Sequence, residues 1–394
     1  MGWGTVVLKV TISGALAPGL AAPDVTRRQV TVGLLAAAAS FAGIDAPADA
    51  RKKKGKRRKN RKKKKQNQRY DNPVLKNANV ALGVYLPRAL DDRAVLTDFH
   101  TSIGRSLDFV IWYEGWSRGN FDNGHRQYLS TFDAWNMTPV ISWNPFDANG
   151  PTINQPAYRL TNITRGDFNG YIDSWATGLR TYSKPVYLKF AHEMNGNWFP
   201  WGVGVNGNGP GDFVAAWRYI HKRFASKGVS NVRWIWNPNI VYDSLPATLQ
   251  DVYPGHDYVD WVGMNGYNWG TSVYWASCPC QSRWESFAQV FDRTYRELVA
   301  LANKPIFIGE FASSESGGNK ARWISDALLE QLPTQYPKVK AISWFSKIAT
   351  GLDTIASGEV VPTAEVDWRV NSSNAARNAF AEAVKTPYYN ATLG

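Results

Sequence analysis

Eight short apolar segments, each followed by a longer segment suited to a helix, constrain the fold of this chain more than any other feature. The expected strands are Val80–Tyr85, Phe109–Tyr113, Pro139–Trp143, Val186–Ala191, Val232–Trp236, Tyr258–Met264, Ile306–Gly309 and Ala341–Phe345. They are rich in β-branched and aromatic residues, which favour buried strands. Strands that alternate with helices pair in parallel, and eight such units predict an α/β fold closed into a (β/α)8 barrel.

Two of the intervening segments carry clear helix signals. Asp212–Phe224 starts with an aspartate that we expect to be the N-cap, and it ends in a basic turn shortly before Gly228. Phe287–Ala302 carries apolar residues at helical spacing. No boundary indicates a second folded domain, so we expect a single barrel domain over residues 73–394.

The formal net charge of +13 comes from one stretch of the chain. Arg51–Lys65 holds 13 basic residues and no acidic one, so the rest of the chain is formally neutral. A block of like charges repels itself and resists burial, which predicts a disordered linker over residues 51–72. Such a run suits a tether to an anionic cell-wall or membrane surface, or a linker that is only solvated. The run also suits nucleic-acid binding. An export signal at residues 1–50 argues against that function.

Residues 1–50 have the layout of an export signal. The pair Arg27-Arg28 precedes an apolar run, Val30–Ile44, and Ala48–Ala50 offers small residues around a cleavage point. The paired arginines resemble a twin-arginine signal, with a valine where a phenylalanine is common. The apolar run is shorter than the roughly 20 residues of a membrane span; an anchor that is never cleaved is the alternative. We therefore expect a secreted, extracellular protein.

The carboxyl ends of the expected strands carry polar and aromatic residues, and in such barrels the active site lies at that end. His192 and Glu193 end the fourth strand, and Glu310 ends the seventh. Retaining glycosidases need two carboxyl groups roughly 5–5.5 Å apart, one as proton donor and one as nucleophile. A ring of aromatic and amide side chains around two carboxylates predicts a carbohydrate site, although each residue alone is more often structural. The other strand ends supply Tyr85, Trp112, Glu114, Trp116, Trp143, Asn144, Trp236, Asn237, Asn265, Tyr267 and Trp344.

Two segments resemble a known family. His192-Glu193-Met194-Asn195-Gly196-Asn197-Trp198, followed by Trp201, resembles the acid/base segment of glycoside hydrolase family 26, and Gly309-Glu310-Phe311 is similar to its nucleophile segment. The similarity extends from about residue 79 to about residue 383. The family implies a (β/α)8 barrel, retention of anomeric configuration and mostly endo-β-1,4-mannanase activity. Members that act on mixed-linkage β-glucan or on β-1,3-xylan also occur.

The resemblance also implies roles for single residues. Glu193 becomes the general acid/base and Glu310 the nucleophile, which requires Glu193 to hold a proton while Glu310 stays anionic. The hydroxyl of Tyr267 is expected to donate to Glu310. His192 is expected to contact the sugar at the cleavage point, where related barrels usually have Asn; a structural histidine is the alternative.

Three tryptophans are expected to bind substrate because indole faces stack on sugar rings. Trp344 resembles the platform under the reacting sugar, and Trp198 and Trp201 are expected to line the groove, although single tryptophans are usually core residues. Glu114 also ends a strand but has no motif around it, so we expect it to form an ordinary ion pair or to bind a sugar hydroxyl.

No metal or cofactor is expected. The histidines show no ligand spacing; they are His100, His125, His192, His221 and His256. The only cysteines, Cys278 and Cys280, cannot complete a typical zinc site. In an exported protein they either form a strained disulfide or stay as free thiols.

The sequence thus predicts a monomeric endo-glycosidase whose partner is a plant-type β-linked polysaccharide. β-1,4-Mannan is the first substrate that the resemblance suggests, and β-1,3-1,4-glucan and β-1,3-xylan are the alternatives. A glycan-binding or wall-associated protein without turnover is a candidate of another class, although both glutamates are present. A nucleic-acid-binding protein would rest on the basic run alone and predicts binding that weakens with salt.

Overall fold

The structure, a computed structural model, describes residues 72–275, 280–354 and 360–393, and residues 69–394 form one compact unit. The expected export signal at residues 1–50, the basic run Arg51–Lys65 and Cys278 lie outside the described residues. The hypotheses about export, tethering and a disulfide therefore stay predictions.

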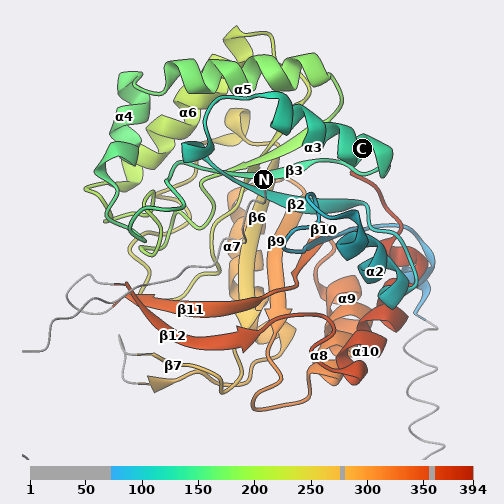
Figure 1. The fold of residues 1–394 in the computed structure, drawn as a ribbon. Coiled ribbons are helices and arrows are strands. Elements are labelled where there is room, and N and C mark those ends of the chain that lie inside the picture. Colours follow the sequence, from blue (N-terminus) through green and yellow to red (C-terminus); the bar gives the residue numbers. More distant parts are fainter. Residues whose placement is uncertain (1–71, 276–279, 355–359, 394) are drawn as a thin grey trace, which may run out of the picture. The chain divides into compact units, whose positions relative to one another are not determined.

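The fold is a closed barrel of eight parallel strands, which confirms the predicted (β/α)8 class (Figure 1). The strands are β1 (Ala81–Tyr85), β2 (Phe109–Gly115), β3 (Val140–Asn144), β4 (Val186–Phe190), β5 (Val232–Trp236), β6 (Trp261–Asn268), β9 (Ile306–Ser313) and β10 (Val339–Phe345). They follow one another around the barrel, and β10 pairs with β1 to close it. The sixth strand begins later than expected, because Tyr258 belongs to the short helix η4 (His256–Tyr258).

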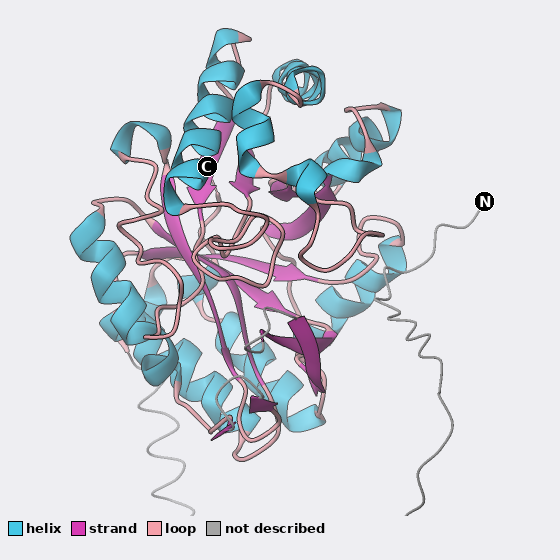
Figure 2. Ribbon diagram, turned by 90° about the vertical axis from the view of Figure 1, so that its left-hand side faces the viewer, coloured by secondary structure: helices cyan, strands magenta, loops and turns pink. Residues whose placement is uncertain are grey.

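Helices surround the strands on the outside of the barrel, as Figure 2 shows. The α-helices are α2 (Arg93–Ile103), α3 (Asn123–Ala134), α4 (Leu160–Arg165), α5 (Asn169–Tyr182), α6 (Pro210–Ser226), α7 (Phe287–Leu301), α8 (Lys320–Asp326), α9 (Leu332–Gln335) and α10 (Asn374–Val384). Short turns of other helix types are η1 (Pro73–Lys76), η2 (Trp116–Arg118), η3 (Pro156–Tyr158), η5 (Ala327–Gln331) and η6 (Pro387–Tyr389). None of the described helices is long and apolar enough to cross a membrane.

Helices α6 and α7 lie close to their predicted bounds. Helix α7 follows Ser286, whose hydroxyl accepts a hydrogen bond from the amide of Gln289. Helix α6 starts earlier than expected, because Pro210 occupies the first helical position and Gly209 is the N-cap. The N-cap prediction for Asp212 is therefore wrong: its carboxylate, one turn inside the helix, accepts from the Gly209 amide at 2.7 Å.

Two antiparallel hairpins add to the carboxyl end of the barrel (Figure 1). One pairs β7 (Tyr274–Trp275) with β8 (Cys280–Gln281), and the other pairs β11 (Ile348–Thr354) with β12 (Val360–Asp367). Because β7 follows β6 and β11 follows β10 along the chain, both hairpins belong to the end where the predicted active site lies.

The barrel lumen is apolar towards the amino ends of the strands. The rings of Phe109 and Phe307 meet there, with centroids 5.4 Å apart. The packing is tight, because a Cβ atom on Gly83 would lie 2.0 Å from the Phe109 ring. The rest of this plug consists of Ala81, Ile111, Val140, Tyr187, Ile235, Ala341 and Leu393.

Polar side chains replace the apolar plug two residues further along several strands. Residues two apart in a strand face the same side. Tyr113, Ser142 and Lys189 each lie two residues beyond a member of the plug, so they face the lumen at its carboxyl end. The alternation of the strands therefore builds a polar floor above an apolar plug.

A β-bulge at Gly309 turns Glu310 into the lumen. Ile308 pairs with Met264, but Glu310 pairs with the very next residue of β6, Asn265. Because Phe307 faces the lumen, unbroken alternation would point Gly309 inward and Glu310 outward. The extra residue reverses this order, so Glu310 points inward and Phe311 packs on the outside of the barrel.

Candidate active site

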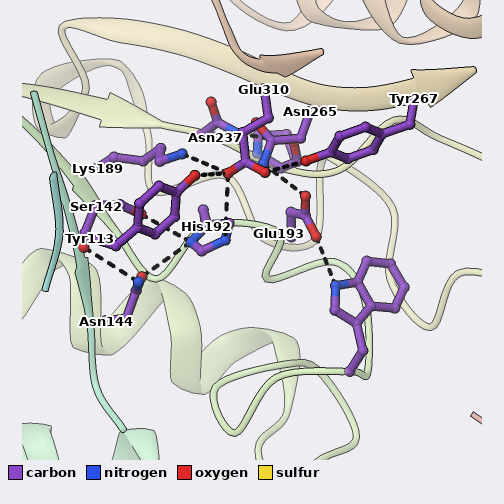
Figure 3. A network of polar contacts seen from close by, with 12 residues as sticks. Tyr113, Ser142, Asn144, Lys189, His192, Glu193, Asn237, Asn265, Tyr267 and Glu310 are labelled. Carbon is purple, nitrogen blue, oxygen red and sulfur yellow. Dashed lines mark hydrogen bonds and ion pairs between the residues drawn. The ribbon is translucent and has the colours of Figure 1, made fainter. Parts of the chain in front are cut away.

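Glu310 lies at the centre of the polar network at the carboxyl end of the lumen (Figure 3). Tyr113 and Tyr267 each donate a hydroxyl hydrogen bond to its carboxylate, one to each oxygen. The ammonium nitrogen of Lys189 lies 3.2 Å from Oε1. Burial alone would raise the pKa of Glu310, but the charge of Lys189 and the two hydroxyl bonds outweigh it and hold the pKa below its usual value. Glu310 is therefore an anion held by residues of three other strands.

Glu193 is the second buried carboxyl group, in the turn that follows β4. Asn265 donates a hydrogen bond to its Oε1, and the indole of Trp198 donates one to its Oε2, both at 2.7 Å. Burial, and then the negative charge of Glu310, raises the pKa of Glu193 to about 7. Glu193 thus holds a proton close to neutral pH, whereas Glu310 does not.

The backbone that carries Glu193 is strained. Ala191 has a φ of +46° and Glu193 a φ of +55°, in the left-handed region that residues other than glycine seldom adopt. Hydrogen bonds to neighbouring segments hold this turn: the Glu193 amide donates to the Asn237 carbonyl at 2.8 Å, the Trp201 indole donates to the His192 carbonyl at 2.7 Å, and the Ala191 amide donates to the Trp143 carbonyl at 3.1 Å. Strain of this kind collects at functional sites, and here it brings two consecutive side chains into the same site.

His192 lies on the polar floor beside Glu310. Its Nδ1 is 3.2 Å from the Ser142 hydroxyl and 3.1 Å from Asn144 Oδ1, and its Nε2 is 3.8 Å from Glu310 Oε1. Burial, and then the positive charge of Lys189, lowers the pKa of His192 to about 3. His192 is therefore neutral at the pH where Glu193 titrates and acts as a hydrogen-bonding group, not as a charge.

Several residues of the site were not singled out from the sequence. Lys189 is fully buried and lies next to Glu310, and Tyr113 is the second hydroxyl donor to that carboxylate. The signal for both is a polar group at an inward position of a buried strand. Asn265 and Asn237 were noted only as strand ends; Asn237 donates to Asn265 at 2.8 Å, which in turn orients Asn265 towards Glu193.

Two of the predicted stacking tryptophans face the core instead. Trp344 is fully buried, packs against Phe311 and Phe380, and donates its indole hydrogen to the Trp368 carbonyl. Because side chains alternate along β10, the next residue, Phe345, is the one that faces the barrel mouth. The platform predicted for Trp344 is therefore wrong.

Trp201 is also a core residue, whereas Trp198 lies at the site. Trp201 is 1% exposed, so it cannot offer a face to a sugar, and it lies stacked under Phe199 with ring centroids 4.6 Å apart. Trp198 is partly exposed and touches Glu193 through its indole nitrogen. Trp198 belongs to the site as a hydrogen-bond donor to the acid/base candidate.

Glu114 forms the ion pair that was one of its two expected roles. Its carboxylate lies 3.0 Å from Arg118 and accepts a hydrogen bond from the Trp112 indole at 2.8 Å. Glu114 is buried, on the outside of the barrel and not in its lumen.

In the described parts of the chain, no three His, Cys, Asp or Glu side chains lie close enough together to hold a metal ion.

Comparison with known proteins points to one family. The sequence model of glycosyl hydrolase family 26 matches residues 129–307, a range that includes Glu193 and ends just before Glu310. Endoglucanase H of Acetivibrio thermocellus is 34% identical over 310 residues, which cover 78% of this chain and 31% of that protein. A mannan endo-1,4-beta-mannosidase of Bacillus subtilis is 25% identical over 201 residues, 48% of each chain.

A solved structure shares the fold. The catalytic domain of the Bacillus sp. JAMB-750 GH26 endo-beta-1,4-mannanase superimposes with a TM-score of 0.56 at 15% identity, over 81% of this chain and 90% of that one. The chain spans about a third of Endoglucanase H and about half of the mannosidase.

Proposed function

This chain belongs to glycoside hydrolase family 26, and we propose that it cleaves internal bonds of a β-linked polysaccharide with retention of anomeric configuration. One observation carries the proposal: two buried carboxyl groups share a site, one beside an ammonium group and two hydroxyl donors and the other bound by an amide and an indole, and these surroundings drive their pKa values apart. A protonated Glu193 beside an anionic Glu310 is the pair that a double displacement requires.

In the first step, a carboxylate oxygen of Glu310 attacks the anomeric carbon while Glu193 gives its proton to the glycosidic oxygen. The bond to the leaving sugar breaks, and the other half of the chain becomes an ester of Glu310. Esterification removes the negative charge of Glu310, which is one of the causes that raise the pKa of Glu193. The pKa of Glu193 therefore falls, and Glu193 is deprotonated when the second step needs a base.

In the second step, Glu193 takes a proton from a water molecule, whose oxygen attacks the anomeric carbon. The ester bond to Glu310 breaks, the carboxylate is restored, and the proton stays on Glu193. The hydroxyls of Tyr113 and Tyr267 and the ammonium of Lys189 surround the departing carboxylate. They stabilise it as a leaving group because each favours the charged form.

A β-glucan is our leading candidate for the substrate. The relative named as an endoglucanase is 34% identical over 78% of this chain, whereas the mannosidase is 25% identical over 48%. This order differs from the one that the resemblance of short segments suggested, in which mannan came first. β-1,4-Mannan is the second candidate, because several relatives named as mannan endo-1,4-beta-mannosidases also match this chain.

Export is a further part of the proposal. Residues 1–50 have the layout of a twin-arginine signal, and Arg51–Lys65 suits a tether to an anionic surface. A polysaccharide too large to enter a cell also requires its hydrolase outside. Replacing Arg27-Arg28 by two lysines should leave the protein inside the cell, as measured by fractionation; unchanged export would contradict the twin-arginine route.

The test of function is reducing-sugar release by a truncated chain starting near Tyr70. The substrates are mixed-linkage β-glucan, mannan, galactomannan and β-1,3-xylan, each also incubated with the Glu310→Ala variant as the matched control. We expect cleavage of mixed-linkage β-glucan that Glu310→Ala abolishes. Cleavage of the mannans alone would replace the substrate and keep the mechanism. Tight binding without release of reducing ends would contradict the proposed hydrolysis.

A further inference from the structure

A pocket of about 340 Å³ opens between the loop that follows β3 and the loop that follows β4. Asn154 and Arg159 line it from the first loop, and Asn197, Gly204 and Gly207 line it from the second. This pocket is separate from the polar network around Glu310, and the mechanism above makes no use of it.

The pocket lies on the acid/base side of the site. Asn197, on its wall, directly precedes Trp198, whose indole donates a hydrogen bond to Glu193. Glu193 protonates the oxygen of the leaving sugar, so the chain beyond that oxygen departs on the side of Glu193. Two consecutive residues of the loop that follows β4 therefore connect the wall of the pocket to the acid/base candidate.

Two asparagines fix the shape of the pocket by joining the loops. Asn206 donates to the Pro200 carbonyl at 3.0 Å and accepts from the Gln155 amide at 3.0 Å. Asn208 donates to the same carbonyl at 2.9 Å and accepts from the amide of Leu160 at 3.0 Å. A pocket that is already formed binds its ligand at a lower ordering cost, because its own loops need not be fixed on binding.

The wall offers hydrogen-bond donors without partners. Within the described residues, the side chains of Asn154 and Arg159 make no hydrogen bond or ion pair, and both residues are exposed. Gly204 and Gly207 have φ angles of +81° and +75°, and no atom lies within 4 Å of where a Cβ would be. The lining has no aromatic ring and no acidic side chain, so it suits a ligand rich in hydroxyl groups that is held by hydrogen bonds and not by stacking.

We propose that this pocket is a distal subsite for the leaving-group side of the polysaccharide, in which Arg159 and Asn154 bind sugar hydroxyls. The inference rests on the proposed hydrolysis and adds a chain-length preference to it. Substrates long enough to reach the pocket gain binding energy there, whereas short ones end before it.

The experiment compares kcat/KM of the wild type and of Arg159→Ala on oligosaccharides of increasing length, prepared from the polysaccharide that the wild type cleaves. Arg165→Ala is the matched control, because Arg165 is an exposed arginine of the adjacent helix α4 that does not line the pocket. We expect Arg159→Ala to lower kcat/KM about tenfold or more on long oligosaccharides, as for the loss of a hydrogen bond to a charged group. It should leave short oligosaccharides and the site of cleavage within them unchanged.

The outcomes separate this inference from the function on which it rests. An equal loss on short and long oligosaccharides, or no loss on any, would overturn the subsite while wild-type turnover upheld the hydrolase. A wild type without activity on any β-glycan would contradict the hydrolase itself. The double variant Asn154→Ala/Arg159→Ala should deepen the loss on long substrates only.

Discussion

At the scale of single residues, the site works because the two carboxyl groups have different neighbours. Glu310 receives two hydroxyl donors and faces an ammonium group, whereas Glu193 receives only the neutral donors of Asn265 and Trp198. Both groups are buried, so the charge nearby decides which one keeps its proton. Lys189 is the group that makes Glu310, and not Glu193, the anion.

The protonation of Glu193 predicts the basic limb of the pH profile. Its pKa of about 7 lies above its usual value, so the acid form is present below that pH and is lost as the pH rises through it. We expect kcat/KM to fall above about pH 7. Glu193→Gln should remove this limb and lower kcat/KM on polysaccharide by about 10²–10⁴-fold. A basic limb that persists in the variant would assign it to another group.

Replacing Lys189 by methionine tests the acid limb. Without the positive charge the pKa of Glu310 rises, so the pH below which activity is lost should move up by about one unit or more. The variant should also unfold at a lower temperature at neutral pH, because Glu310 becomes a buried charge without its cation. This loss of stability should shrink as the pH falls and Glu310 takes a proton. An unchanged acid limb would show that Lys189 does not control Glu310.

At the scale of elements, the order and extent of the strands follow from the sequence. The side of the sheet that each side chain faces does not always follow from it. The rule that residues two apart in a strand face the same side places Tyr113 and Lys189 correctly above the apolar plug. It fails on β9, because the bulge that points Glu310 inward depends on pairing with β6 and β10. Between Ala341 and Phe345 of β10 the alternation holds and places Trp344 outside the barrel, which contradicts the stacking role that resemblance alone suggested.

Gly309 makes that bulge possible. A Cβ atom there would lie 2.3 Å from Asn237 Oδ1 and 2.8 Å from Asn265 Oδ1, and Asn237 Nδ2 donates a hydrogen bond to that Asn265 oxygen. Gly309→Ala should therefore destabilise the fold by about 1–3 kcal/mol and lower kcat. Gly170→Ala is the control, since Gly170 lies in α5 and no atom lies within 4 Å of where its Cβ would be. Urea unfolding measures both; equal stability of the two variants would contradict this role.

At the scale of the whole molecule, the barrel brings together residues that are far apart in the chain. From sequence, only resemblance and strand order join the Glu193 segment to the Glu310 segment. The role of Lys189 could not be predicted, because an inward position on a buried strand does not tell which group the lysine faces; the role appears only when β9 brings Glu310 within 3.2 Å. Trp201 and Trp344 were misplaced because aromatic residues fill the core as readily as they bind sugars.

The most direct test of the central claim is to trap the glycosyl-enzyme on its nucleophile. A 2-deoxy-2-fluoro β-glycoside with a reactive leaving group, made from the sugar of the substrate that is cleaved, slows breakdown of the ester more than its formation. We predict that one glycosyl unit is added per chain, that peptide mass spectrometry finds it on Glu310, and that Glu310→Ala takes none. A label on another residue, or an unlabelled enzyme that releases products with inverted configuration, would contradict the double displacement proposed here.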